Sequence, residues 1–184
     1  MAQVAVSYTE HPEDVLSRWL AWREIGPVAL VMITSTVGGA VRAPGALMAV
    51  TADGDVAGYI SGGCIDADVV LQAQNALKDG KAKSLRYGAG SPFVDLPLPC
   101  GGAIELVIEP DADAEAVRAC RDRLQARKPA TLDLDIAGDF QPLYQPKLHL
   151  RIAGRGADSL ALARIARASG IDASFQLRDG EDVE

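Results

Sequence analysis

The spacing of apolar and polar residues predicts a helix followed by a buried strand at the start of the chain. Pro12 and two acidic residues after it mark a helix start, because proline suits the first helical position and the helix dipole favours acids there. Val15, Trp19 and Trp22 follow at helical spacing and predict one core-facing stripe. Residues 27–33 are an unbroken apolar run rich in branched side chains, which is typical of a strand covered on both faces.

A hairpin and a second helix are predicted next. Residues 36–46 contain too much glycine and proline for a regular element and are expected to form a loop. Residues 47–51 and 56–60 are predicted to pair as strands, because the Asp-Gly between them favours a tight hairpin. Residues 65–79 carry apolar side chains at a helical period, and Gly80 is a suitable helix end.

Alternating segments predict further regular elements up to residue 146. The predicted strands cover residues 83–87, 103–108 and 132–136, the last of them half-exposed. A helix is predicted for residues 113–127, with Cys120 as a small core residue on its apolar face. Residues 88–99 form a predicted loop, and residues 138–146 a connection between units.

A strand, a helix and a strand are predicted after Pro146, over residues 148–153, 157–169 and 171–177. A sheet of two parallel strands cannot bury its own apolar faces. We therefore expect this incomplete Rossmann-like βαβ unit to pack on the first domain or on another subunit, or to be the start of a domain that this chain does not contain. We therefore expect an α/β protein. Its N-terminal domain, residues 1–140, has a mixed sheet flanked by helices, and residues 146–184 form the partial βαβ unit.

Composition narrows the class of protein. The chain has 184 residues and a net charge of -7, which argues against a nucleic-acid partner because such binding relies on clustered basic residues. The first residues do not have the pattern of a signal peptide, and no apolar run approaches the ~20 residues that span a bilayer. We expect no membrane association and a cytoplasmic location. Three cysteines, an odd number, do not indicate a disulfide framework.

Two cysteines stand beside paired glycines. Cys64 follows Gly62 and Gly63 at the start of the helix predicted for residues 65–79, where backbone N–H groups stabilise a thiolate or bind a phosphate. Cys100 precedes a second glycine pair, Gly101 and Gly102, before a strand. Glycines allow a bulky ligand to approach the backbone, so the two turns predict a shared pocket. The alternative is that the glycines only shape tight turns and the cysteines pack as small apolar residues.

The chemistry of the two cysteines predicts a soft metal ligand set. Cys64 and Cys100 are suited to zinc, Cu(I) or a cofactor that carries a thiophilic metal. Zinc is disfavoured because two cysteines without a C-x2-C spacing do not complete a structural zinc site.

Three neighbouring features have open interpretations. Arg42, in the loop of residues 36–46, is either a forked donor for a phosphate or a carbonyl-rich ring, or a solvated arginine. Asp66 and Asp68 are expected to complement the helix dipole. The turn at residues 154–156 is Gly-Arg-Gly, but Ser159 stands where a dinucleotide-binding motif has its third glycine, so NAD(P) is a secondary hypothesis.

Three segments resemble the xanthine dehydrogenase accessory factor family (XdhC/CoxI) in order and spacing. They are residues 45–54, Ser61-Gly62-Gly63-Cys64-Ile65-Asp66 and Cys100-Gly101-Gly102. The resemblance covers residues 27–110 closely, and residues 148–179 resemble the start of the family's C-terminal Rossmann-type domain. It implies a chaperone that binds the molybdopterin form of the molybdenum cofactor, shelters it during sulfuration and passes it to a xanthine-dehydrogenase-like molybdoenzyme.

The resemblance also implies residue roles. Cys64 and Cys100 become thiolates that contact the cofactor, and the adjoining glycines, Gly62, Gly63, Gly101 and Gly102, give access to the backbone. The family often has G-S-x-P-R in the first loop, whereas this chain has Gly39-Ala40-Val41-Arg42, which keeps only the arginine of that motif's polar side chains. Family members tend to be longer, with a complete second domain.

Partner expectations and two other functions follow. The open edges of the partial unit predict a homodimer, and sulfuration of the cofactor implies a cysteine desulfurase as a second partner. One alternative function is a nucleotide-dependent oxidoreductase that uses the βαβ unit. The other is a thiol redox or interaction module in which Cys64 and Cys100 form a reversible disulfide.

Overall fold

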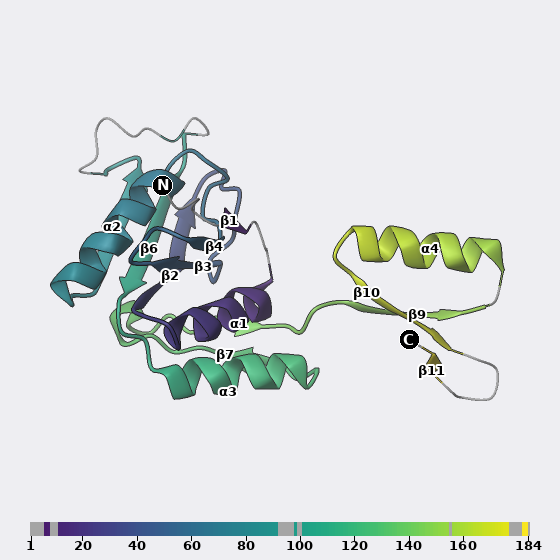
Figure 1. The fold of residues 1–184 in the computed structure, drawn as a ribbon. Coiled ribbons are helices and arrows are strands. Elements are labelled where there is room, and N and C mark those ends of the chain that lie inside the picture. The colour runs from purple at the N-terminus through teal and green to yellow at the C-terminus, as the bar shows by residue number, and fades with distance from the viewer. Residues whose placement is uncertain are drawn as a thin grey trace. The chain divides into compact units, whose positions relative to one another are not determined.

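The computed structural model describes residues 6–7, 11–91, 98, 101–154, 156–176 and 182–183. The chain divides into two units, Met1–Gln145 and Pro146–Glu184. The strands of the first unit's large sheet are β1 (Val6–Ser7), β2 (Val28–Val37), β3 (Leu47–Thr51), β4 (Val56–Gly58), β5 (Lys83–Gly88) and β6 (Ala103–Glu109) (Figure 1). Its helices are α1 (Pro12–Arg23), α2 (Asp66–Asp79) and α3 (Ala114–Gln125).

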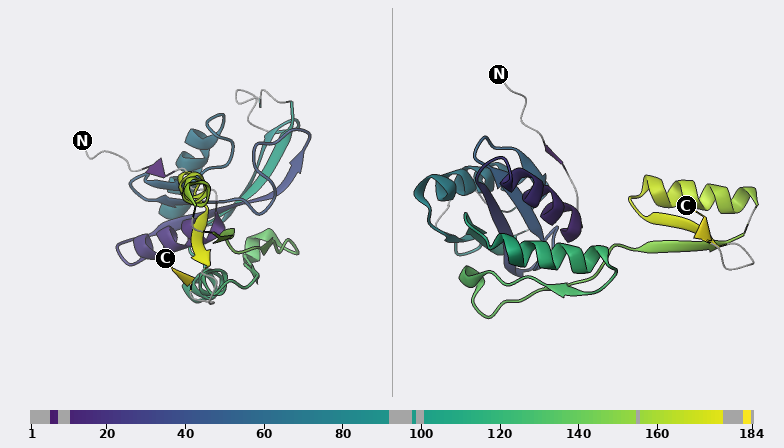
Figure 2. Two further views of the ribbon diagram at one scale, coloured as in Figure 1. Left: turned by 90° about the vertical axis from the view of Figure 1, so that its right-hand side faces the viewer. Right: turned by 60° about the horizontal axis from the view of Figure 1, so that its bottom comes forward.

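The six strands form one mixed sheet in the order β1-β4-β3-β2-β6-β5. β1 is parallel to β4, and every other pair is antiparallel. α1 and α3 pack on one face of the sheet and α2 on the other, so the unit has three layers (Figures 1 and 2). The predicted mixed sheet flanked by helices is confirmed.

β2 is the central strand, and its side chains alternate between the two apolar layers. Val28, Leu30 and Met32 contact the layer that contains α1 and α3, while Ala29, Val31 and Ile33 contact the layer that contains α2. All six are at most 1% exposed. The continuous apolar run therefore forms a strand covered on both faces, as its sequence predicts.

The predicted helices are present, with small shifts at their ends. In α1, Val15 and Trp19 are fully buried, and the indole N–H of Trp19 donates to the carbonyl of Val28 at 3.2 Å. Trp22 is only partly buried at the edge of this core. α2 ends at Gly80, whose φ of +62° closes the helix in the left-handed conformation that favours glycine.

Two boundaries differ from those expected from the sequence. β2 runs on to Val37, inside the segment predicted as a loop, and pairs there with β6 after an irregularity between Ile33 and Ser35. Its last residues, from Thr34 onward, are polar or exposed. Strand pairing uses backbone groups, so the apolar pattern ends before the strand does. β4 ends at Gly58, earlier than the predicted residue 60.

The strand predicted for residues 132–136 is wrong. β7 (Ala130–Thr131) instead pairs with β8 (Leu143–Tyr144), and a short 3-10 helix, η1, covers Asp135–Ala137. Leu132 and Leu134 are nonetheless buried, so the alternating pattern predicts burial correctly in a segment without strand pairing. β8 also lies within the predicted connection, and the Tyr144 hydroxyl donates to the Gly45 carbonyl at 2.9 Å.

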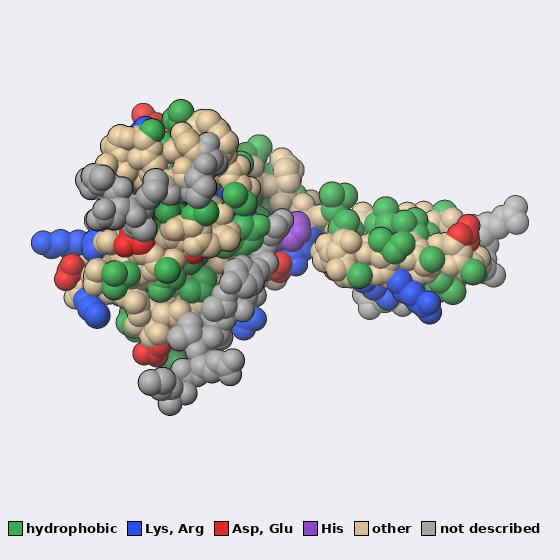
Figure 3. Space-filling model, turned by 90° about the horizontal axis from the view of Figure 1, so that it is seen from above, with side chains coloured by type: hydrophobic (Ala, Val, Ile, Leu, Met, Phe, Trp, Pro, Cys, Tyr) green, Lys and Arg blue, Asp and Glu red, His purple; other side chains and the backbone are tan. Residues whose placement is uncertain are grey.

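The second unit is the predicted βαβ unit. It contains β9 (His149–Ala153), α4 (Ala157–Ala168), β10 (Asp172–Gln176) and β11 (Asp182–Val183). β9 and β10 are parallel, and β11 adds an antiparallel strand. Its core is small, with Ala163 and Ala166 of α4 packed on Ile152 and Ala173. Leucine and isoleucine side chains on the outer side of α4 stay exposed (Figure 3).

Candidate functional site

The residues predicted to bind a cofactor come from three loops at the same end of the six-stranded sheet. Residues 38–46 join β2 to β3, residues 59–65 join β4 to α2, and residues 89–102 join β5 to β6. Because neighbouring strands from β4 to β5 are antiparallel, β2, β4 and β5 all end at this edge, where β3 and β6 begin. The topology therefore gathers segments that are far apart in sequence.

The loop of residues 38–46 packs against the backbone of Gly102. A Cβ on Gly102 would lie 2.6 Å from the Val37 carbonyl oxygen and 2.7 Å from that of Gly39. The Cα of Gly102 lies 3.3 Å from the position of a Cβ on Gly38. Only glycine permits this approach, so Gly102 of the predicted glycine turn has a packing function. Cys100 lies outside the described residues.

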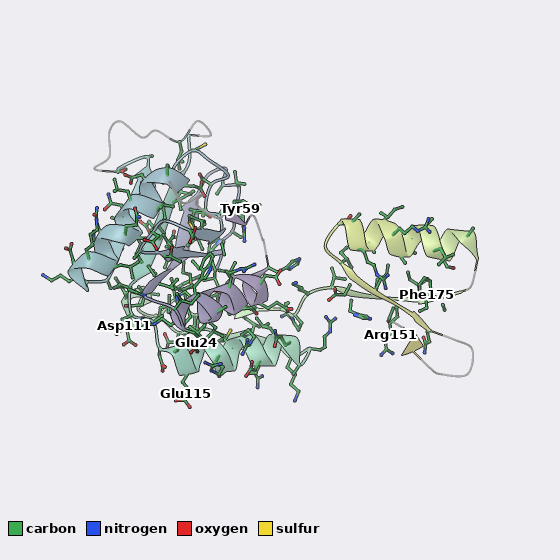
Figure 4. The ribbon with its side chains drawn as sticks, in the orientation of Figure 1. Glu24, Tyr59, Asp111, Glu115, Arg151 and Phe175 are labelled. Carbon is green, nitrogen blue, oxygen red and sulfur yellow. The ribbon has the colours of Figure 1, made fainter. Side chains whose placement is uncertain are left out.

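The same loop runs beside the turn that carries Cys64. The Val41 Cγ1 atom lies 3.9 Å from the position of a Cβ on Gly62. The Arg42 guanidinium stacks over the Tyr59 ring, 4.5 Å from its centroid, just beyond the end of β4 (Figure 4). Arg42 thus belongs to a loop that adjoins both Gly62 and Gly102.

The turn presents Cys64 to solvent. Its thiol is free and exposed. Gly62 and Gly63 are exposed as well, with φ values of +77° and +128° that favour glycine. Next along the chain, Ile65 is 1% exposed and belongs to the core beneath α2. Cys64 therefore lies between two exposed glycines and the buried Ile65.

Asp66 organises this turn from the first residue of α2. The backbone N–H of Ile60 donates to Asp66 Oδ1 at 2.7 Å. Asp66 Oδ2 accepts from the N–H of Ser61 at 3.1 Å, from the N–H of Gly63 at 2.8 Å and from the Ser61 hydroxyl. The N–H of Ile65 donates to the Ser61 hydroxyl oxygen at 3.0 Å. Ser61 and Asp66 together accept hydrogen bonds from the backbone N–H groups of Ile60, Ser61, Gly63 and Ile65.

The electrostatics of Asp66 agree with this geometry. Burial acts to raise the pKa of Asp66, but hydrogen bonds from the Ser61 hydroxyl and from the amides of Ile60, Gly63 and Ser61 hold the pKa below its usual 3.8. The sequence predicts only a dipole role for Asp66, and the signal for more is its position two residues after the Gly-Gly-Cys turn, with Ser61 before it.

The amides that donate to Asp66 belong to the turn before α2. Those of Ile60, Ser61 and Gly63 donate to the Asp66 carboxylate, so an external anion at these three groups would have to displace it. The N–H groups in the first turn of α2 are different groups, and their availability to a phosphate stays a prediction. Arg42, in the loop of residues 38–46, is a second candidate for an anionic group.

Asp68 has a different function from Asp66. Its Oδ2 accepts from the Tyr87 hydroxyl at 2.6 Å, and Tyr87 is fully buried on β5. Burial, and then the neighbouring Asp68 carboxylate, raise the pKa of Tyr87 well above its usual value. The contact ties the first turn of α2 to the sheet beneath the site.

Residues 21–88 match the XdhC and CoxI family. The chain is also 34% identical over 160 residues to the molybdenum cofactor insertion chaperone PaoD of Escherichia coli K12, an alignment that covers 78% of this chain and 50% of that protein. The chain is therefore similar to the XdhC and CoxI family over residues 21–88 and to this insertion chaperone over a longer stretch. The match to the family includes Arg42 and the Cys64 turn, and the chain spans about half the length of the curated relative.

The fold of this chain has a solved counterpart. A crystal structure of a xanthine dehydrogenase from Bacillus halodurans superposes with a TM-score of 0.72 at 24% identity. The superposition covers 90% of this chain and 62% of the other. At this identity the comparison supports a shared fold.

Cys120 is a core residue, as predicted. Its side chain is 2% exposed and packs with α1 and α3. Burial raises the pKa of Cys120 to about 11, against an opposing effect of Arg123. The thiol is therefore protonated and enclosed at neutral pH.

Two features are absent from the described residues. Within the described ranges, no group of three or more His, Cys, Asp or Glu side chains is placed to hold a metal ion. In the same ranges, no helix has the length and apolar character needed to cross a bilayer.

The turn between β9 and α4 offers little support for a nucleotide. A Cβ on Gly154 would lie 2.5 Å from the Ser159 hydroxyl oxygen, so Ser159, which replaces the third glycine, crowds the turn. The Asp158 carboxylate lies beside Gly156 and would repel a phosphate. Arg155 lies outside the described residues.

Proposed function

We propose that this protein is an XdhC/CoxI-family carrier for the molybdenum cofactor, which it holds at Cys64 and Cys100 and delivers to a xanthine-dehydrogenase-like molybdoenzyme. The observation that carries the proposal is the exposed Cys64 thiol on an open glycine turn beside the Arg42 loop. The identity to a molybdenum cofactor insertion chaperone supports it.

The residues present fit such a cargo. A thiol is a soft ligand suited to a thiophilic metal, and Gly62 and Gly63 leave the backbone open beside it. Arg42 supplies a forked cation for the anionic part of the cargo. Cys100 supplies the second thiol, with Gly101 and Gly102 beside it. The chain binds, orients and releases its cargo and acts as a carrier, not as a catalyst.

Exposed apolar side chains border the same loop. Val37 is 57% exposed and Val41 67% exposed. They supply an apolar rim that the acceptor molybdoenzyme covers during transfer. A homodimer, a cysteine desulfurase as a second partner and a cytoplasmic location stay predictions from the sequence.

A binding titration tests the proposal. The purified chain is titrated with molybdenum cofactor under anaerobic conditions, and the dissociation constant is measured by equilibrium dialysis with an assay of protein-bound molybdenum. We expect Cys64→Ala and Cys100→Ala each to weaken binding about tenfold or more, roughly 1.4 kcal/mol. Cys120→Ala is the matched control and should bind as the wild type does. Unchanged affinity in both the Cys64 and Cys100 variants would reject the assigned site.

A further inference from the structure

We propose that Asp66, acting through Ser61 and Gly63, is a positioning residue that fixes the Cys64 thiol for its cargo. The inference rests on the proposed function for the identity of the cargo. The carboxylate lies two residues after Cys64, yet its hydrogen bonds go to residues before it, so the chain on both sides of the cysteine is held by one network.

The network fixes the two neighbours of Cys64. On one side, the N–H of Gly63 donates to Asp66 Oδ2 at 2.8 Å. On the other, the N–H of Ile65 donates to the Ser61 hydroxyl oxygen at 3.0 Å, and that hydroxyl donates to Asp66 Oδ2. The Ile65 side chain is also sealed in the core. The backbone of Cys64 is therefore held at both ends while its thiol stays exposed.

The glycine pair makes this support necessary. Gly62 and Gly63 have the greatest backbone freedom of any residue type. Apart from the chain neighbours of Gly63, no atom of the described residues lies within 4 Å of a Cβ position on Gly63. Side-chain packing therefore does little to hold Gly63. Its hydrogen bond to Asp66 supplies the restraint, which lowers the entropy lost when a ligand binds the thiol.

Only a carboxylate suits this position. Both Asp66 oxygens accept hydrogen bonds, Oδ1 from Ile60 and Oδ2 from Ser61 and Gly63. An asparagine has the same shape but one oxygen and one NH2 group. In either orientation its NH2 group would face an N–H donor, so Asp66→Asn opens one side of the network without changing volume.

Asp68→Asn is the matched control. It removes the same charge from the same helical turn, but the Asp68 carboxylate accepts from the Tyr87 hydroxyl and serves no N–H of the turn. Asparagine keeps an acceptor oxygen for that hydroxyl. A pure charge effect would therefore appear equally in both variants, whereas positioning of Cys64 fails only in Asp66→Asn.

Hydrogen exchange and binding test the proposal together. We expect Asp66→Asn to speed exchange of the Gly63 amide about tenfold and to weaken cofactor binding about tenfold, with Asp68→Asn close to the wild type in both. Ser61→Ala should show part of both changes. Ser61→Thr keeps the hydroxyl, so its Gly63 exchange and its cofactor binding should be close to those of the wild type. These two variants keep the test valid if Asp66→Asn fails to fold.

Two results would overturn the positioning role. One is equal cofactor affinity in the Asp66→Asn and Asp68→Asn variants, and the other is unchanged Gly63 exchange in Asp66→Asn. Failure of the proposed function gives a different signature, because the wild type then does not bind molybdenum cofactor. In that case the alkylation rate of Cys64 still tests the positioning role. The rate should differ between the Asp66→Asn and Asp68→Asn variants if Asp66 positions the thiol, and equal rates would reject that role.

Discussion

The surroundings of Cys64 and Cys120 differ although both cysteines belong to the first unit and both adjoin helices. Cys120 lies within α3 on its apolar face, where it is 2% exposed and packs with α1. Cys64 precedes α2 and stands exposed on a glycine turn that its own Asp66 holds in place. The position of a cysteine relative to its helix, inside it or just before it, therefore separates the buried Cys120 thiol from the exposed Cys64 thiol.

Alkylation should give the largest difference between the two thiols. With a pKa of about 11, only about one Cys120 thiol in a thousand is ionised at pH 8, and burial blocks access as well. We expect iodoacetamide to modify Cys64 rapidly and to leave Cys120 unmodified in the folded protein, as read by peptide mass spectrometry. In guanidinium chloride both should react at similar rates. Rapid modification of Cys120 in the folded state would contradict its assignment as a buried, protonated thiol.

The two glycines after Cys100 give a second, smaller contrast. Gly102→Ala places a Cβ against two carbonyl oxygens of the neighbouring loop and should lower the free energy of unfolding by about 1–3 kcal/mol. It should also shift the amide resonances of Gly38 and Gly39. In Gly101→Ala the new Cβ meets no atom of the described part of the chain within 4 Å, but the φ of Gly101 is +69°, so this variant should cost about 1 kcal/mol without those shifts. Equal shifts in both variants would argue against close packing at Gly102.

Acid titration gives the smallest expected effect. The pKa of Asp66 is held below 3.8 in the folded chain, so its contribution to stability is present above the pKa of the unfolded state and is lost as the pH falls through the folded value. As the pH falls below about 4, the unfolding free energy of the wild type should therefore fall more steeply than that of Asp66→Asn. Chemical denaturation at several pH values measures this. Parallel curves would contradict the hydrogen-bond network at Asp66.

Much of the fold follows from local patterns in the sequence. The apolar run at residues 28–33, the Asp-Gly hairpin and the helix end at Gly80 each have a short-range physical cause, and the structure contains them where they are expected. The failures concern long-range packing. Leu132 and Leu134 alternate like a strand because they pack against the core, while their backbone lacks a strand partner.

The residues of the candidate site could be predicted from the sequence, but the contacts between them could not. The paired glycines and Cys64 are visible in the sequence, whereas the hydrogen bonds that Asp66 makes to Ser61 and Gly63 depend on how the turn closes. The approach of Gly102 to Gly39 depends on the order of β2 and β6 in the sheet. For the Asp66 network the sequence offers only the position of Asp66 two residues after Cys64, and for the approach of Gly102 it offers no spacing signal.

Molybdenum K-edge absorption of the cofactor-loaded protein tests directly whether the Cys64 sulfur binds the metal. If Cys64 holds the cargo through its sulfur, the wild type should show one more sulfur neighbour of molybdenum than Cys64→Ser, and Cys120→Ser should match the wild type. An identical sulfur shell in the wild type and in Cys64→Ser would contradict the account.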